Sequence, residues 1–93
     1  MYFLDIKPEA DKIFKVLEKK NKKRLEIIYK KIEEIRQKPS HVYKFLKQPL
    51  QSFNRAHIEK HFVLIFKINH EEKAVDVYYF DHHDNAYKWR PKP

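Results

Sequence analysis

The sequence predicts a small α+β domain in which a helical hairpin packs against a mainly antiparallel sheet. Three observations favour this fold class: residues 8–37 carry apolar side chains at helical spacing, residues 52–80 contain short apolar strands, and the connections between those strands are brief. The predicted order is β-α-α-β-β-β, and helices segregated to one side of an antiparallel sheet define an α+β domain. The 93 residues suit one domain, residues 1–93, with one modest core.

The first half of the chain predicts one strand and two helices. Residues 2–6 alternate loosely between apolar and polar side chains, which indicates a short strand. Pro8 and the acidic residues after it suit a first helical turn. We expect a break at Asn21 and a helix end at Pro39, so the two helices should form an antiparallel hairpin. The apolar residues at helical spacing are Ala10, Ile13, Phe14, Leu17, Leu25, Ile28, Tyr29, Ile32 and Ile35.

The second half predicts a loop followed by three strands. Residues 38–51 contain two prolines and show no clear period, which indicates a loop over the surface. Strands are predicted at residues 52–59, 62–68 and 74–80. The middle strand, FVLIFKI, is almost continuously apolar, so we expect it to be central in the sheet or covered on both faces.

Composition narrows the classes of function. The chain has 21 Lys and Arg residues against 13 Asp and Glu residues, a net charge of +8, and it has neither glycine nor cysteine. The positive charge favours nucleic acid, the ribosome or an acidic protein as partner. The missing cysteine and glycine exclude a thiolate zinc site and argue against a glycine-rich phosphate loop. No apolar run approaches the roughly 20 residues of a membrane helix, and the N-terminus does not read as a signal peptide, so we expect a cytoplasmic protein without membrane contact.

Histidines gather at the ends of the predicted strands. His57 ends one strand and His61 begins the next, so a tight connection brings both to one rim of the sheet. His82 and His83 leave the last strand, and antiparallel pairing with residues 62–68 places that end beside the same rim. We therefore expect these histidines, with the carboxylate that follows them, to converge. The histidines assigned to solvent in predicted loops are His41 and His70.

Three interpretations of this cluster compete. A histidine and a second proton-transfer group can cleave RNA: a base deprotonates the 2′-hydroxyl, an acid protonates the leaving 5′-oxygen, and cations stabilise the charged phosphate. The second interpretation is metal binding: His57 and His61 have the i, i+4 spacing of a zinc-binding helix. On a predicted hairpin, however, that spacing is weaker evidence for a metal site. The third interpretation is a group of surface histidines without a function.

Cationic and aromatic residues near the cluster are candidates for RNA binding. Tyr87 suits stacking on a base or hydrogen bonding to phosphate, because aromatic residues beside cations bind single-stranded RNA. Packing of the tail on the sheet is the alternative for Tyr87 and Trp89. The candidate RNA- or phosphate-binding residues are Lys47, Arg55, Lys88, Trp89 and Arg90.

Two segments together resemble a known family. KQPLQSFNRAHIEKHFVLIFKI (residues 47–68), followed by YYFDHHDNAY (residues 78–87), resembles the RelE/ParE toxin superfamily of toxin–antitoxin modules, especially its YafQ-like branch of mRNA-cleaving toxins. With the helical hairpin, the resemblance covers nearly the whole chain. It implies a RelE-like, microbial-ribonuclease-like fold and a ribonuclease that cuts mRNA in the ribosomal A site without metal or cofactor. It also implies contacts with ribosomal RNA and a cognate antitoxin that forms a hetero-oligomer with the toxin.

The resemblance assigns roles to individual residues. His57 matches the histidine of the branch's AHVE segment, His83 its late histidine and Tyr87 its terminal aromatic residue. His61 stands where the branch has an aspartate. The implied proton-transfer pair is His57 and His83, with Asp84 orienting His83 and Tyr87 placing the substrate. The resemblance implies no metal ligand.

Three positions depart from the branch pattern. Gln48 replaces a histidine, Ser52 replaces a glycine, and Val63 stands where related toxins have a phosphate-binding arginine. These departures keep two other functions open: a ParE-like toxin that inhibits DNA gyrase without nuclease chemistry, and a domain that binds RNA or the ribosome but has lost catalysis. The cations available to replace the arginine are Lys47, Arg55 and Arg90.

Overall fold

The computed structural model describes residues 1–92 and confirms the predicted α+β fold with its β-α-α-β-β-β order. A short helix at the end of the last strand was not predicted. No helix within residues 1–92 is long and apolar enough to cross a membrane. The elements are β1 (Phe3–Ile6), α1 (Pro8–Lys20), α2 (Lys22–Gln37), β2 (Asn54–Ile58), β3 (Phe62–Asn69), β4 (Ala74–His82) and α3 (His83–Ala86).

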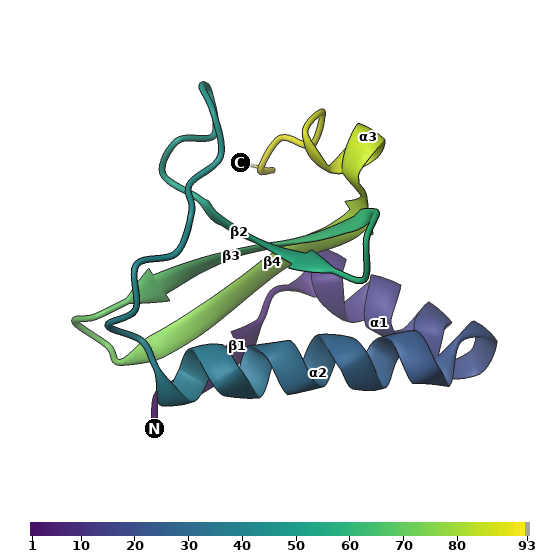
Figure 1. Ribbon diagram of the computed structural model, residues 1–93, viewed down its shortest axis with the longest axis horizontal. Helices are drawn as coiled ribbons and strands as arrows, with labels where there is room; N and C mark the ends of the chain where they lie inside the picture. Colours follow the sequence, from purple (N-terminus) through teal and green to yellow (C-terminus); the bar gives the residue numbers. More distant parts are fainter. Residues whose placement is uncertain (93) are drawn as a thin grey trace.

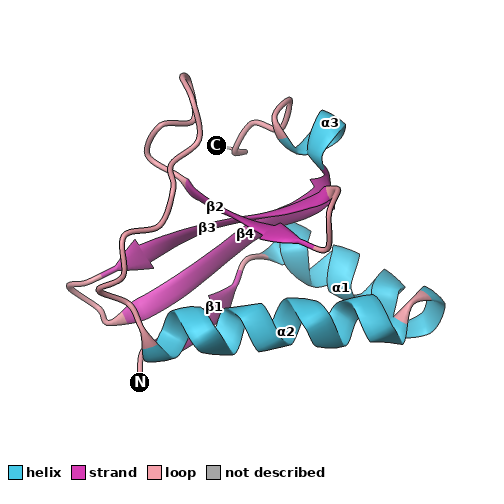
Figure 2. Ribbon diagram, in the orientation of Figure 1, coloured by secondary structure: helices cyan, strands magenta, loops and turns pink. Residues whose placement is uncertain are grey.

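The four strands form one sheet in the order β1-β4-β3-β2 (Figure 2). Strands β2 and β4 both pair antiparallel with β3, whereas β1 is parallel to β4, so the sheet is mainly antiparallel as predicted. Phe62, the first residue of β3, lies opposite Ile58 on one side and His82 on the other. The β2–β3 connection and the end of β4 therefore meet at one rim of the sheet.

Different parts of the chain cover the two faces of the sheet. Helices α1 and α2 lie along one face, and the loop of residues 38–53 and the C-terminal segment stand over the other (Figure 1). Within β3, Leu64 and Phe66 belong to the core under the helices, while Val63 and Ile65 belong to a second core under the loop and the C-terminal segment. The prediction that this strand is central and covered on both faces is confirmed.

Asn21 both ends α1 and starts α2. Its backbone N–H donates to the carbonyl of Leu17 at 2.7 Å, and its side-chain oxygen accepts a hydrogen bond from the backbone N–H of Arg24 at 3.1 Å. A side-chain acceptor at this position satisfies an amide that the first turn leaves unpaired. The predicted break is confirmed. Among the predicted core residues of the helices, Tyr29 lies at the margin, 36% exposed, with its ring edge against Phe14.

Both strand connections are built without glycine. Glu59 and Lys73 take the left-handed conformation, each with φ of 54°. This conformation costs an ordinary residue about 1–2 kcal/mol. Glu59 also forms an ion pair with Arg24 of α2, at 2.7 Å between Oε1 and Nε, which links the β2–β3 connection to the helix.

Replacing Phe66 with alanine tests the core beneath the helices. Its ring is fully buried, so Phe66→Ala is expected to lower the free energy of unfolding by about 3–5 kcal/mol. Phe45→Ala makes the same chemical change at a ring that is 59% exposed, and a loss below about 1 kcal/mol is expected there. Urea unfolding followed by circular dichroism measures both values, and equal losses would contradict this placement of the core.

Candidate functional site

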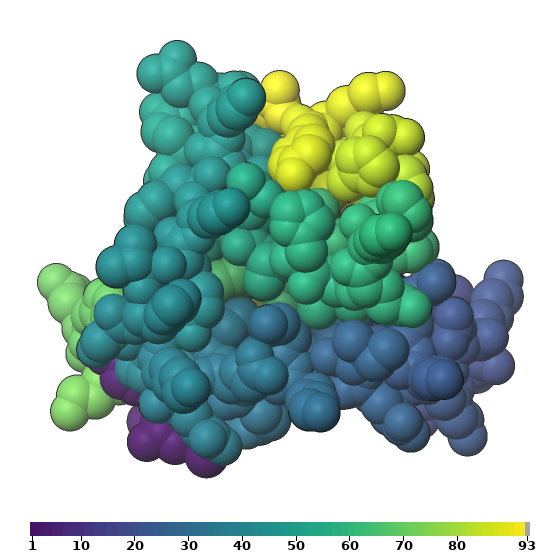
Figure 3. Space-filling model, viewed as in Figure 1, coloured from purple at the N-terminus to yellow at the C-terminus, as the bar shows by residue number. Residues whose placement is uncertain are grey.

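A groove lies on the face of the sheet opposite the helices, between the loop of residues 38–53 and the C-terminal segment (Figure 3). Its volume is about 440 Å³. The groove brings together two cations and a phenol from three separate parts of the chain: Lys47 from the loop, Arg55 from β2 and Tyr87 from the turn after α3. Gln48, which stands where the related branch has a histidine, also lines it.

Strand alternation places His57 on the same face as the groove. Arg55 pairs with Ile65 and His57 with Val63, and both partners belong to the second core. Successive residues of a strand point to opposite faces, so Arg55 and His57 share the groove side. Arg55 Nη1 lies 3.5 Å from His57 Nδ1, which sets the imidazole beside the guanidinium. The structure therefore joins His57 to the cationic groove.

The C-terminal segment forms one wall of the groove because Trp89 holds it down. The indole is 8% exposed and stacks on Tyr79, with ring centroids 5.5 Å apart and an interplanar angle of 14°. Its edge meets Phe53, and its Nε1 donates a hydrogen bond to Glu9 Oε1 at 2.9 Å. The prediction that Trp89 contacts RNA is therefore corrected: its ring is inside the protein. Trp89 instead packs on the sheet, which is the alternative given for it above.

The other tail cations remain at the surface. Lys88 and Arg90 are exposed. Arg90 Nη1 donates to the carbonyls of Tyr87 at 3.3 Å and Trp89 at 2.8 Å, so the guanidinium folds back on its own turn. Lys88 lies next to the groove wall in sequence, and Tyr87 is 43% exposed at the groove itself.

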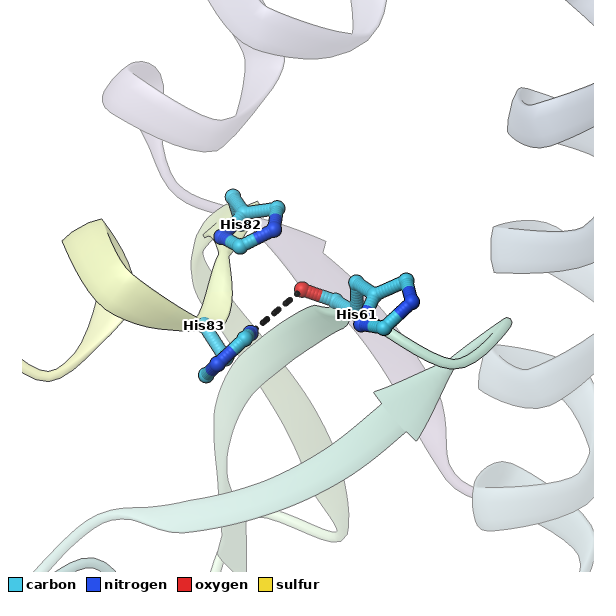
Figure 4. A group of neighbouring side chains, drawn as sticks. All are labelled: His61, His82 and His83. Carbon is cyan, nitrogen blue, oxygen red and sulfur yellow. Dashed lines mark hydrogen bonds between the residues drawn. The ribbon is translucent and has the colours of Figure 1, made fainter.

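A second group of side chains occupies the rim of the sheet (Figure 4). One ring nitrogen from each of His61, His82 and His83 lies within 4.8 Å of the other two. The backbone N–H of His83 donates to the carbonyl of His61 at 2.7 Å, and its Nδ1 lies 3.2 Å from the same oxygen. Asp84 Oδ1 lies 3.1 Å from His83 Nε2, so the predicted contact between these two residues is present.

The predicted convergence of histidines holds for the rim but not for His57. His57 is in register with Val63, whereas His82 is in register with Phe62, so the two histidines point to opposite faces of the sheet. No hydrogen bond joins His57 to His83 within residues 1–92. His82 is a member of the rim group that is not among the catalytic residues predicted from the sequence. The available signal for it is the adjacent pair in DHHD, which directly follows the strand predicted at residues 74–80; the structure makes His82 the last residue of β4.

Tyr79 and Asp81 form a polar pair next to the rim. The Tyr79 hydroxyl donates to Asp81 Oδ2 at 2.8 Å, and Asp81 Oδ1 accepts the backbone N–H of His82 at 2.7 Å. Burial, this hydrogen bond and the negative charges of Asp81 and Glu9 raise the pKa of Tyr79 to about 12. Asp81 is thus occupied by structural hydrogen bonds, and Tyr79 stays protonated at neutral pH.

The two remaining departures from the related branch have different surroundings. Val63 is fully buried in the second core, where an arginine side chain would have to be desolvated. Ser52 is exposed in the turn before β2. Arg55, on the neighbouring strand β2, lines the groove and is the cation available in place of the phosphate-binding arginine of the related toxins.

Comparisons with known proteins agree with this fold. No family model matches the sequence. A protein of Methanocaldococcus jannaschii designated RelE4 and described as a candidate toxin is 51% identical over 88 residues, which are 95% of this chain and 93% of that protein. The metal-bound toxin from Helicobacter pylori has a TM-score of 0.76 at 21% identity over 91% of this chain and 98% of that one. A chain of the Escherichia coli RelBE toxin–antitoxin complex has a TM-score of 0.71 at 20% identity, over 88% and 96%.

The helical hairpin on one face of a four-stranded sheet is thus a fold that this chain shares with these solved toxin structures. The 51% identical relative carries the RelE designation along almost its full length. The chain belongs to the RelE/ParE superfamily of toxins, and the resemblance of its two sequence segments to that family is confirmed.

The raised pKa of Tyr79 predicts a loss of stability in alkali. Unfolded tyrosine ionises near pH 10, whereas Tyr79 in the folded protein ionises at about 12. The stabilisation from the protonated phenol is therefore fully present below about pH 10 and is lost as the pH rises toward about 12. Between these values the free energy of unfolding should fall more steeply for the wild type than for Tyr79→Phe. Parallel slopes in urea titrations of the two proteins would contradict the assignment.

Proposed function

We propose that the protein is a ribosome-dependent endoribonuclease, the toxin of a type II toxin–antitoxin module, which inhibits translation by cleaving mRNA. The observation that carries the proposal is the groove that unites Lys47, Arg55 and Tyr87, with His57 beside the guanidinium. A concave surface that combines cations with an exposed aromatic ring suits a single RNA strand. The net charge of +8 supports attraction to the ribosome and its RNA.

The proposed chemistry uses a base, an acid and fixed positive charge. His57 takes the proton of the 2′-hydroxyl as that oxygen attacks the phosphorus. His83, oriented by Asp84 and by the carbonyl of His61, gives a proton to the departing 5′-oxygen. The charge that develops on the phosphate is stabilised by the groove cations. The products carry a 2′,3′-cyclic or 3′-phosphate on one side and a 5′-hydroxyl on the other.

The geometry places a condition on the path of the RNA. His57 and Arg55 lie at the groove, whereas His83 starts α3 at the rim. Because both histidines act on the same phosphate, the scissile phosphate must lie over the end of β3, between His57 and His83. Tyr87, which lines the groove, then stacks on a base and sets the position of the neighbouring phosphate.

A cognate antitoxin is part of the proposal. The related Escherichia coli structure is a RelBE toxin–antitoxin complex, and a surface as basic as this one suits an acidic protein partner. Such a partner would neutralise the toxin by covering the groove within a hetero-oligomer.

Inhibition of DNA gyrase without cleavage is the second candidate function. The observation that favours it is Val63, a fully buried apolar side chain where related nucleases have a phosphate-binding arginine. On this alternative the basic groove is a protein-binding surface, and His57 and His83 have no part in proton transfer.

Mapping mRNA 5′ ends on translating ribosomes tests the nuclease. We expect new 5′-hydroxyl ends within A-site codons for the wild type, and a rate lowered by about a hundredfold or more for His83→Ala and for His57→Ala. His70→Ala is the matched control, because His70 is exposed in the β3–β4 connection, at the opposite end of β3 from the rim, and it should cleave like the wild type.

Intact mRNA with the folded wild-type protein would overturn the nuclease proposal for the ribosomes used. A supercoiling assay with purified gyrase then examines the alternative, and inhibition that survives both His83→Ala and His57→Ala would support it. Cleavage by the wild type that is unchanged in both variants would place the chemistry on other residues.

A further inference from the structure

The three rim histidines come from two segments that the sheet brings together. His61 lies in the connection before β3, and His82 and His83 span the junction of β4 and α3 (Figure 4). The rings of His61 and His82 are stacked, with centroids 5.9 Å apart and 13° between their planes, and those of His82 and His83 are 4.5 Å apart. One nitrogen of each ring lies within 4.8 Å of the other two.

We propose that these three imidazoles bind a divalent transition-metal ion, with Zn²⁺ the best match. Imidazole nitrogen suits zinc, copper and nickel, whereas magnesium and calcium prefer oxygen. Three histidine ligands leave a fourth position for water, as in open zinc sites. The proposal revises the expectation of no metal ligand, and it goes beyond the proposed nuclease activity without depending on it.

The hydrogen bonds of His83 are those of a metal-binding histidine. A carbonyl oxygen can only accept, so the 3.2 Å contact with the His61 carbonyl requires His83 Nδ1 to carry the proton. This fixes the tautomer in which Nε2 keeps its lone pair, the arrangement that backbone carbonyls impose on many metal ligands. Nε2 in turn faces Asp84 Oδ1 at 3.1 Å. Two electron-rich atoms at that distance repel each other unless a proton or a cation lies between them.

Asp84 places negative charge next to two of the three rings. Its carboxylate lies 3.1 Å from His83 Nε2 and 3.6 Å from His82 Nδ1. His82 Nδ1 also accepts a 3.3 Å hydrogen bond from the backbone N–H of Asp84, so this nitrogen carries a lone pair too. The carboxylate therefore offsets the charge of a bound cation, and the long hydrogen bond at an exposed helix start is readily exchanged for a metal bond.

The spacing fits a zinc ion after small rotations. With Zn–N distances of about 2.0–2.1 Å in a tetrahedron, neighbouring ligand atoms are about 3.3–3.4 Å apart. One nitrogen of each ring lies within 4.8 Å of the other two, so these three atoms must approach one another by at most roughly 1.5 Å. The side chains of His82 and His83 are 39% and 42% exposed, which leaves their rings room to turn.

Calorimetric titration of the metal-free, full-length protein with ZnCl₂ tests the site. We expect one Zn²⁺ per chain, with affinity reduced at least about tenfold in His82→Ala and in His61→Ala. His41→Ala, which removes an exposed histidine from the loop of residues 38–53, should bind like the wild type. Circular dichroism checks that each rim variant is folded. Two rim variants are used so that the test still stands if one of them does not fold.

Cobalt gives a second readout. Co²⁺ bound by nitrogen ligands in a tetrahedral site absorbs strongly in the visible range, and added Zn²⁺ should remove this absorbance whereas Mg²⁺ should not. No saturable binding, or equal affinity in the wild type, the folded rim variants and His41→Ala, would overturn the proposal. Neither assay contains RNA or ribosomes, so the absence of nuclease activity would leave these results unaffected.

Discussion

Packing of the Trp89 indole on the sheet is the interaction that holds the C-terminal segment and, with it, one wall of the groove. The ring lies over Tyr79 and against Phe53, and its N–H reaches Glu9 at the start of α1. A single side chain near the end of the protein thus ties the C-terminal segment to the first helix and to β4. This packing seats the groove wall that presents Tyr87, while the start of α3 is held by the hydrogen bond from the His83 backbone N–H to the His61 carbonyl.

The proposed nuclease and the proposed metal site share His83. This residue is the proposed acid of the nuclease and also one of three proposed metal ligands, and its Nε2 lone pair cannot serve both roles at once. A bound metal ion would therefore compete with proton transfer at the rim while leaving Arg55 and Tyr87 of the groove in place. The two proposals are independent in their evidence but are linked in their chemistry through this one ring.

The helices and strands are predicted well from the sequence because their apolar residues recur with a clear period. The site is predicted less well because the direction of each side chain depends on the register of strand pairing. Hairpin geometry alone brings His61 to the segment that follows β4, as the structure confirms. Hairpin geometry does not determine which face of the sheet each side chain points to, because a shift of one residue in the pairing moves a side chain to the other face. His57 pairs with Val63 and His82 with Phe62, so the two histidines lie on opposite faces. The tail has too little periodicity to show that Trp89 is buried. Helix α3, with four residues, is too short for a helical pattern.

The position of Arg55 shows how a basic groove can persist where Val63 has replaced an arginine. Val63 contributes to the second core that seats the loop and the C-terminal segment, so its burial supports the walls of the groove. Arg55 lies one strand away, and the pairing of β2 with β3 sets it on the same face as Val63. Because that face is fixed by strand alternation, Arg55 on β2 supplies a cation to the groove although Val63 on β3 is buried. Arg55 and Lys47 therefore give the groove its positive charge without an arginine at position 63.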